Sequence, residues 1–249
     1  MTNCKGCLKM NLWSFTGKTK DGRRQYRCRN CGTLQLESPP QGLDIPAKVL
    51  YFDIETSLIT VQEQVWDMKV QKKYIDWKDI TQDRYVICWA GAWMVGDSFS
   101  RVFGGCVTQE EAINRDDSRI ITKLRDKIDV ADVVAGHNMR AFDWKTVNAR
   151  IIMNGLAAPF EPKIADTLSL GRRKFKPTSQ ALEYWSRQLG GNSKDKMCRQ
   201  DWEKIQANGD EKSLRKMYKY CKGDIREGAN IFLKFKKYVE DSTGKPLYR

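Results

Sequence analysis

The sequence predicts an α/β fold, in which a mixed sheet is flanked by helices and preceded by a small metal-binding module. Short apolar runs rich in β-branched and aromatic residues, such as residues 49–52, are typical of buried strands. Segments with apolar residues three and four positions apart, such as residues 116–128, are typical of helices. Strands that come first and then alternate with helices indicate a sandwich around a mixed sheet. Two CxxC pairs within residues 1–37 indicate the metal-binding module.

The N-terminal module is predicted to be a Cys₄ zinc ribbon at residues 1–37, followed by a linker at residues 38–48. Its two pairs are 20 residues apart, and each can supply two thiolates to one ion; the four ligands would be Cys4, Cys7, Cys28 and Cys31. Such a short segment has too small a core to fold by packing alone, so one structural Zn²⁺ would supply folding energy. Disulfides are the alternative, and a reducing compartment disfavours them.

Basic and aromatic residues lie between the two pairs, where a small β-hairpin is expected. Such residues could contact a phosphate backbone and bases. Residues 22–32, GRRQYRCRNCG, resemble the zinc ribbons of transposases and other DNA-handling proteins. This resemblance implies a role with nucleic acid.

The chain of 249 residues carries a formal net charge of +13. Residues 1–48 hold 9 Lys/Arg against 3 Asp/Glu and the rest 35 against 28, so the excess is not confined to a tail. A basic surface favours a polyanionic partner such as nucleic acid, with mere solubility charge as the alternative. The longest apolar run, residues 85–95, is too short to span a bilayer, and no signal peptide is expected. We expect a cytoplasmic protein with no membrane partner.

The larger domain is predicted to span residues 49–249. A polar stretch at residues 57–84 follows the first strand, and its Trp66, Tyr74 and Trp77 are expected to pack over the site. Further strands are expected at residues 85–95 and 100–104 (joined at Gly96-Asp97), 132–136 and 163–167. Helices are expected at residues 116–128 and 141–153, and then through most of the remainder, ending in a long amphipathic run at residues 212–239.

Two carboxylates follow the first apolar strand. Side chains two apart on a strand point to the same side, so Asp53 and Glu55 project together. Crowded carboxylates at the end of a buried strand repel each other and are costly to desolvate. A hard cation such as Mg²⁺ or Mn²⁺ removes that cost. Ordinary solvated acids at a strand end are the alternative.

Two later segments contribute further candidates. Asp143 lies at the start of a helix that follows a strand, where open α/β sheets place ligand sites, although a capping carboxylate fits the same position. Tyr220 and Asp224 are four residues apart, on one face of a predicted helix. A solvated acid beside a core tyrosine is the alternative there.

The three segments YFDIET, HNMRAFD and YCKGD, at residues 51–56, 137–143 and 220–224, occur in this order. They resemble the three motifs of the DEDD superfamily of 3′–5′ exonucleases, which has a ribonuclease H-like fold. The Tyr-x-x-x-Asp form of the third motif resembles the tyrosine branch, in particular the proofreading exonuclease domain of family B DNA polymerases. The sister branch has a histidine where this chain has Lys219, and His137 is expected to make only a structural contact.

The resemblance implies two catalytic Mg²⁺ or Mn²⁺ ions, with Asp53, Glu55, Asp143 and Asp224 as metal ligands. It implies that Tyr220 orients the attacking water. It further implies substrate contacts by Thr56, Leu58, Asn138 and Phe142. A basic loop, Arg172, Arg173, Lys174 and Lys176, could track the strand or be merely solvated.

The expected function is therefore a two-metal-dependent 3′–5′ exonuclease on single-stranded DNA. No polymerase palm fits in this length, so a stand-alone enzyme of proofreading, repair or recombination end trimming is expected. Its partner would be a DNA polymerase or recombination protein in a bacterial or phage-infected cell. An RNA 3′–5′ exonuclease, a structure-selective endonuclease and a non-catalytic nucleic-acid-binding module are the alternatives.

Overall fold

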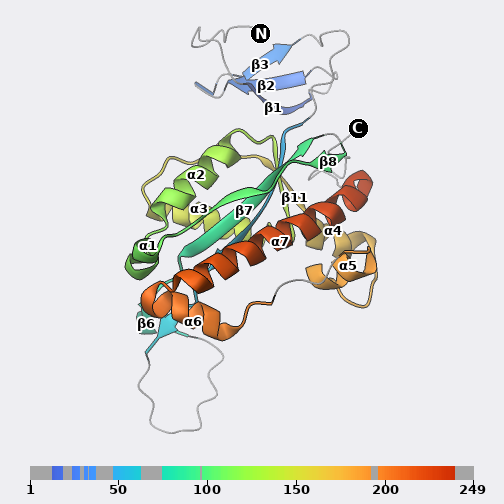
Figure 1. The fold of residues 1–249 in the computed structure, drawn as a ribbon. Coiled ribbons are helices and arrows are strands. Elements are labelled where there is room, and N and C mark those ends of the chain that lie inside the picture. Colours follow the sequence, from blue (N-terminus) through green and yellow to red (C-terminus); the bar gives the residue numbers. More distant parts are fainter. Residues whose placement is uncertain are drawn as a thin grey trace.

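The computed structural model describes residues 13–18, 24–28, 31–32, 34–37, 47–62, 75–95, 97–191 and 196–238. Its main feature is a mixed sheet in the order β11-β10-β4-β7-β8, with β9 paired to β7 (Figure 1). Strand β4 runs parallel to β10 and antiparallel to β7. The strands are β4 (Val49–Thr56), β7 (Val86–Val95), β8 (Ser98–Phe99), β9 (Phe103–Cys106), β10 (Val133–Gly136) and β11 (Lys163–Asp166). The predicted mixed sheet is confirmed.

Helices cover both faces of this sheet. The side chains of consecutive residues on a strand point to opposite faces of the sheet, so two neighbouring residues of β7 report on both faces. The indole of Trp89 donates a hydrogen bond to Ile120 O on α2 (Ser118–Asp129), whereas the thiol of Cys88 interacts with that of Cys221 on α7 (Glu211–Phe235). Helix α3 (Asp143–Met153) packs beside α2. Figure 1 shows α7 running beside β7 on one side, with α2 and α3 on the other side of β7.

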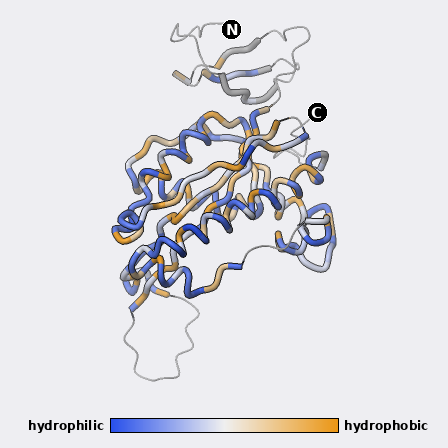
Figure 2. The backbone as a smooth tube through the Cα atoms, in the orientation of Figure 1, coloured by the Kyte–Doolittle hydropathy of each residue, from blue (hydrophilic) through white to orange (hydrophobic). Residues whose placement is uncertain are grey.

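The core is built from β4 and the apolar faces of these helices. Residues 49–52 of β4 are all buried, which follows from its position between β10 and β7. The apolar residues of α2 that predicted it, Ile120, Ile121, Leu124 and Ile128, are buried as well. Along α7, hydrophilic and hydrophobic residues alternate (Figure 2), as expected for a helix with one face on a sheet.

A buried ion pair fixes α3 against the sheet. Asp117, at the N-terminus of α2, is fully buried and accepts hydrogen bonds from Arg150 Nε at 2.8 Å and Nη2 at 2.9 Å. It also accepts one from the backbone N–H of Val86, at the start of β7. Removing one partner of such a pair leaves a buried charge without compensation, which destabilises strongly. The position of α3, and of its first residue, therefore depends on this pair.

The remaining elements connect the sheet and its helices. They are β5 (Thr60–Val61), η1 (Trp77–Asp79), β6 (Ile80–Gln82), α1 (Gln109–Asn114), α4 (Thr167–Lys174), α5 (Leu182–Gln188), α6 (Arg199–Asn208) and η2 (Lys236–Tyr238). No helix within the described residues is long and apolar enough to cross a membrane.

Three expectations need correction. The strand expected at residues 100–104 is replaced by the two short strands β8 and β9, because both pair with different parts of β7. Residues 172–174 form the last turn of α4 rather than a loop, a position where cations are favourable. Trp77 does not pack over the site, since 72% of it is exposed; Trp66 and Tyr74 lie outside the described residues.

Near the N-terminus a second, antiparallel sheet has the order β1-β2-β3. Its strands are β1 (Trp13–Lys18), β2 (Arg24–Cys28) and β3 (Leu34–Glu37), so the expected hairpin between the CxxC pairs is present. Cys28 is buried and Cys31 is exposed. Cys4 and Cys7 lie outside the described residues, as does most of the linker. The zinc site and the domain boundaries therefore stay predictions.

Candidate active site

Strand β4 places two carboxylates on the face of the sheet that α7 covers. Asp53 and Glu55 are both half-buried. The Cys221 sulfur, on α7, lies 3.6 Å from Asp53 O and 4.0 Å from Asp53 Oδ2, which fixes the face. The period of two along a strand then puts Glu55 on this face too. The juxtaposition predicted from the sequence is confirmed.

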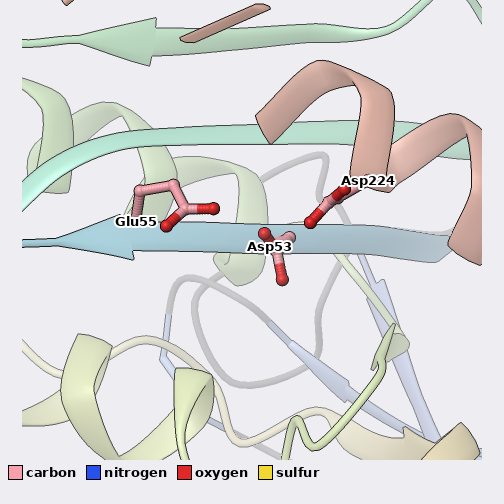
Figure 3. A group of neighbouring side chains, drawn as sticks. All are labelled: Asp53, Glu55 and Asp224. Carbon is pink, nitrogen blue, oxygen red and sulfur yellow. The ribbon is translucent and has the colours of Figure 1, made fainter. Parts of the chain in front are cut away.

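Helix α7 supplies the third carboxylate. Asp224 is buried, and one carboxylate oxygen each of Asp53, Glu55 and Asp224 lies within 4.8 Å of the other two. Figure 3 shows the two strand residues and the helix residue turned toward one another. We call these three residues the carboxylate group. Like charges at this separation destabilise one another unless a cation or protons compensate them.

Asp143, the first residue of α3, lies at the edge of β4 that pairs with β10, and it is not one of the three acids whose carboxylate oxygens lie within 4.8 Å of one another. Its Oδ1 accepts the backbone N–H of Ile54, which lies between Asp53 and Glu55, at 3.1 Å. The pairing of β10 with β4 ends at Tyr51, so this N–H has no strand partner on that side, and the carboxylate takes its place. Burial raises the pKa of Asp143 from 3.8 to about 7, and the charge of Asp166 adds to the rise.

Tyr220 lies one helical turn before Asp224. Burial is the main cause that raises the pKa of its phenol far above the usual 10.0, and the charges of Asp224, Glu55 and Asp53 raise it further. A hydrogen bond with Asp224 acts in the same direction. The phenol therefore stays protonated at neutral pH and can donate a hydrogen bond, but it cannot accept a proton.

The donor set of the carboxylate group fits hard divalent cations. Mg²⁺ and Mn²⁺ prefer oxygen ligands, and Mg²⁺ binds them at ~2.1 Å, so that oxygens on opposite sides of one ion are ~4.2 Å apart. The spacing of up to 4.8 Å needs only a small closure to reach this geometry. No other group of three or more potential ligands this close is present in the described residues.

A pocket of about 530 Å³ adjoins the carboxylate group at Glu55. Three of the four predicted substrate contacts line it, namely Thr56, Leu58 and Phe142. Its other lining residues are Ser57, Ile59, Arg84, Arg199 and Trp202. The guanidinium of Arg84 lies 5.7 Å from the centre of the Phe142 ring. The pocket thus combines apolar and aromatic surface with two cations.

Sequence reasoning missed Arg84, Arg199 and Trp202. Helix α6 carries two of them and is held to the segment after β4 by long-range hydrogen bonds. Trp202 Nε1 donates to Thr56 O at 3.0 Å, and the amide of Gln206 bonds both Leu58 N (3.3 Å) and Leu58 O (3.1 Å). No local periodicity in the sequence signals such contacts.

Asn138 is not among the residues that line this pocket. It adopts a left-handed conformation with φ of 67°, and its backbone N–H donates to Asp166 Oδ1 at 3.1 Å. Its neighbour His137 bonds Thr167 Oγ1 and Gln180 O, both at 3.0 Å, which is a structural contact as expected. A substrate contact by Asn138 stays a prediction.

Comparisons with known proteins bear on this arrangement. The family model of the RNase H superfamily matches residues 78–235, which include Asp143, Tyr220 and Asp224. The chain belongs to the RNase H superfamily. Its mixed sheet with helices on both faces agrees with this assignment. No curated protein matches the chain significantly.

A family B DNA polymerase from the hyperthermophilic archaeon Pyrobaculum calidifontis has a similar fold, with a TM-score of 0.57 and 16% sequence identity. The match covers 92% of this chain and 29% of the polymerase, so the chain spans less than a third of that protein's length. An identity this low shows a shared fold and no more. Together with the acidic group, membership of the RNase H superfamily points to a nuclease domain.

Proposed function

We propose that this RNase H superfamily protein is a two-metal-dependent 3′–5′ exonuclease that acts on single-stranded DNA ends. The observation that carries the proposal is the carboxylate group, with oxygens of Asp53, Glu55 and Asp224 within 4.8 Å. The order of the three motifs in the sequence, and the pocket beside Glu55, support it.

The four acids would bind two different ions. Asp53, Glu55 and Asp224 would hold one ion, and Asp143, with Asp53, would hold the second. Two such ions supply an activated water and neutralise the charge that develops on the phosphate. Asp143 must be ionised to take part, and the cation would lower its raised pKa.

The other residues would bind the terminal nucleotide and orient the attacking water. The phenol of Tyr220, still protonated, would donate a hydrogen bond and orient the attacking water. The pocket would take the terminal nucleotide, with its sugar and base against Leu58 and Phe142. The bidentate amide of Gln206 keeps the backbone at Leu58 in place for this contact. Positioning of this kind contributes to rate by holding reactants in a reactive geometry.

We also propose a structural Zn²⁺ on Cys4, Cys7, Cys28 and Cys31. Their CxxC spacing supports it. Mass spectrometry of the intact protein should find one zinc per chain that Cys28→Ser removes. Cys198→Ser, at an exposed cysteine, should keep it; a metal-free wild-type chain would refute the site.

As its role we propose proofreading in trans or the trimming of ends in repair or recombination, beside a DNA polymerase or recombination protein. The basic charge of the chain supports a nucleic-acid partner. Adding a purified polymerase or recombination protein to the nuclease assay should raise the rate of end trimming; unchanged rates and no co-purification would count against such a partner.

The test of the activity is a nuclease assay with labelled oligonucleotides. In Mg²⁺ or Mn²⁺, a 5′-labelled single strand should shorten stepwise from its 3′ end, and a chelator should stop the reaction. Asp53→Ala and Asp224→Ala should each abolish turnover, because each removes a ligand. Asp126→Ala, at an exposed acid on α2, is the matched control and should keep wild-type activity.

Two further substrates separate the alternatives. An RNA strand of the same sequence tests the preference for DNA, and a circular single strand tests for endonuclease activity, since it has no end. Full activity in both aspartate variants would refute the assignment of the site. Binding without turnover in any divalent metal would favour a non-catalytic module.

A further inference from the structure

Two residues that line the pocket, Leu58 and Ile59, are apolar and exposed. Of the eleven exposed large apolar residues of the described chain, five lie between positions 58 and 77; they are Leu58, Ile59, Val61, Ile75 and Trp77. Such a concentration beside a pocket is typical of a binding surface. Trp77 is the most exposed of the five, at 72%.

One of these residues, Val61, lies in the two-stranded ribbon formed by β5 and β6, and the other four lie in the segments that precede its two strands. Thr60 pairs with Gln82 and Val61 with Ile80, and the next contact outward is Gln62 N to Asp79 O at 2.9 Å. The two residues that flank the ribbon at its base, Ile59 and Arg84, both line the pocket. The ribbon therefore starts at the pocket and leads away from it.

Trp77 lies near the outer end of this ribbon. It belongs to η1, directly before β6, and the last residue of η1, Asp79, is hydrogen-bonded to Gln62, three residues beyond Ile59. At ~3.3 Å per residue this is ~10 Å from the pocket. Each strand of stacked duplex DNA rises ~3.4 Å per nucleotide, so a strand stacked in the same way covers ~10 Å with about three nucleotides.

We propose that the β5–β6 ribbon binds the strand upstream of its 3′ end, with Trp77 stacking on a base about three nucleotides from that end. The proposal rests on the proposed function, because it takes the pocket as the site of the terminal nucleotide. Continuity with the pocket and its two arginines, Arg84 and Arg199, favours a nucleic-acid strand over a protein on this surface. Base–aromatic stacking tolerates any sequence, as such an enzyme requires.

The charges near Trp77 indicate stacking rather than phosphate binding. Its neighbour Lys78 lies between Asp76 and Asp79, so the local charges do not favour an anion. A stacking contact releases no counterions, whereas a cation bound to a phosphate does. Loss of the indole should therefore weaken binding equally at low and high salt.

The test is equilibrium binding of fluorescent oligonucleotides to the full-length protein in a chelating buffer, where no turnover occurs. Trp77→Ala should weaken binding of a ten-nucleotide strand by about 5- to 150-fold, the usual contribution of one stacked base. A dinucleotide is too short to reach the ribbon, and its affinity should not change. The slope of log Kd against log salt should stay that of the wild type.

Two variants serve as controls. Trp77→Phe keeps an aromatic face and should retain most of the affinity. Ile152→Ala removes an equally exposed apolar side chain from α3 and should have no effect. Wild-type affinity of Trp77→Ala for the long strand would overturn the proposal and leave the ribbon to a protein partner. An equal loss for the dinucleotide would overturn it as well.

The binding test of Trp77→Ala can be interpreted whether or not the protein hydrolyses nucleic acid. If the wild type hydrolyses no substrate but Trp77→Ala still weakens only the long strand, the ribbon contact holds and the exonuclease proposal fails. If the exonuclease proposal holds and Trp77→Ala binds long strands normally, only the ribbon contact fails.

Discussion

At the scale of single residues, burial decides which chemistry each group can perform. Desolvation raises the pKa of the Tyr220 phenol and of the Asp143 carboxyl, with opposite consequences. The tyrosine is held in its protonated, hydrogen-donating form. The aspartate is left close to its ionisation point, where a bound cation can convert it to a ligand. A bound metal ion must then lower the pKa of the attacking water so that it can lose its proton.

Tyr220→Phe should reduce kcat by about 10- to 100-fold and leave KM nearly unchanged, because it removes an orienting hydrogen bond rather than a general base, whose loss costs about 10²- to 10⁴-fold. The raised pKa keeps the phenol protonated below pH 10, so the phenol does not titrate between pH 6 and 9. The rise of kcat with pH over this range should therefore be the same in the wild type and in Tyr220→Phe. Steady-state kinetics over this pH range checks both statements.

The matched control is Tyr218→Phe, another half-buried tyrosine on α7, whose ring lies 3.8 Å from Lys222 Nζ. This variant should keep wild-type kcat. A loss of the rising pH dependence in Tyr220→Phe alone would mean that the phenol ionises during turnover, contrary to the role described here.

At the scale of elements, the site depends on the close approach of α7 to β4. Gly228 allows it, because a Cβ at this position would lie 2.7 Å from Tyr51 Cζ. Tyr51 precedes Asp53 by two residues on the same face of β4, so this contact sets the height of α7 above the carboxylates. The aromatic ring of Tyr51 also packs edge-on against Phe232, one turn further along the helix.

Gly228→Ala should lower the free energy of unfolding by about 1–3 kcal/mol, the usual cost of overpacking, and should reduce activity by displacing Asp224. Gly223→Ala, in the same helix with open space around it, should instead raise stability by up to about 1 kcal/mol. Urea denaturation of the three proteins measures both effects. Equal stability of the two variants would refute the proposed role of Gly228.

Much of the site could be predicted from the sequence, because local periodicity carries it. The period of two on a strand aligned Asp53 with Glu55, and a spacing of four on a helix aligned Tyr220 with Asp224. The pocket could not be predicted in full. Trp202 donates a hydrogen bond to Thr56, 146 positions earlier in the chain, and no local sequence pattern indicates which face of a helix contacts which segment.

In the fold, too, the features set by local sequence could be predicted and those set by long-range pairing could not. The buried strand β4 and the amphipathic helices α2 and α7 were predicted, since their own residues specify them. The split of residues 98–106 into β8 and β9 was not, because it depends on pairing with β7.

At the scale of the whole molecule, the topology brings together acids from distant parts of the chain. Strand β4 lies in the middle of the sheet, and β10 beside it is shorter at that end, so the start of α3 reaches its open edge. Helix α7 returns across the same strand from near the C-terminal end of the described chain. The carboxylates of positions 53, 55 and 224 meet there, and position 143 lies at the adjacent edge of β4, near the strand end where open α/β sheets place ligand sites.

The most direct test of the central claim is the anomalous scattering of manganese in crystals soaked with Mn²⁺. We expect anomalous peaks between Asp53, Glu55 and Asp224 and beside Asp143, and their loss in Asp224→Asn crystals. Crystals of the active protein with no manganese between these carboxylates would contradict the claim.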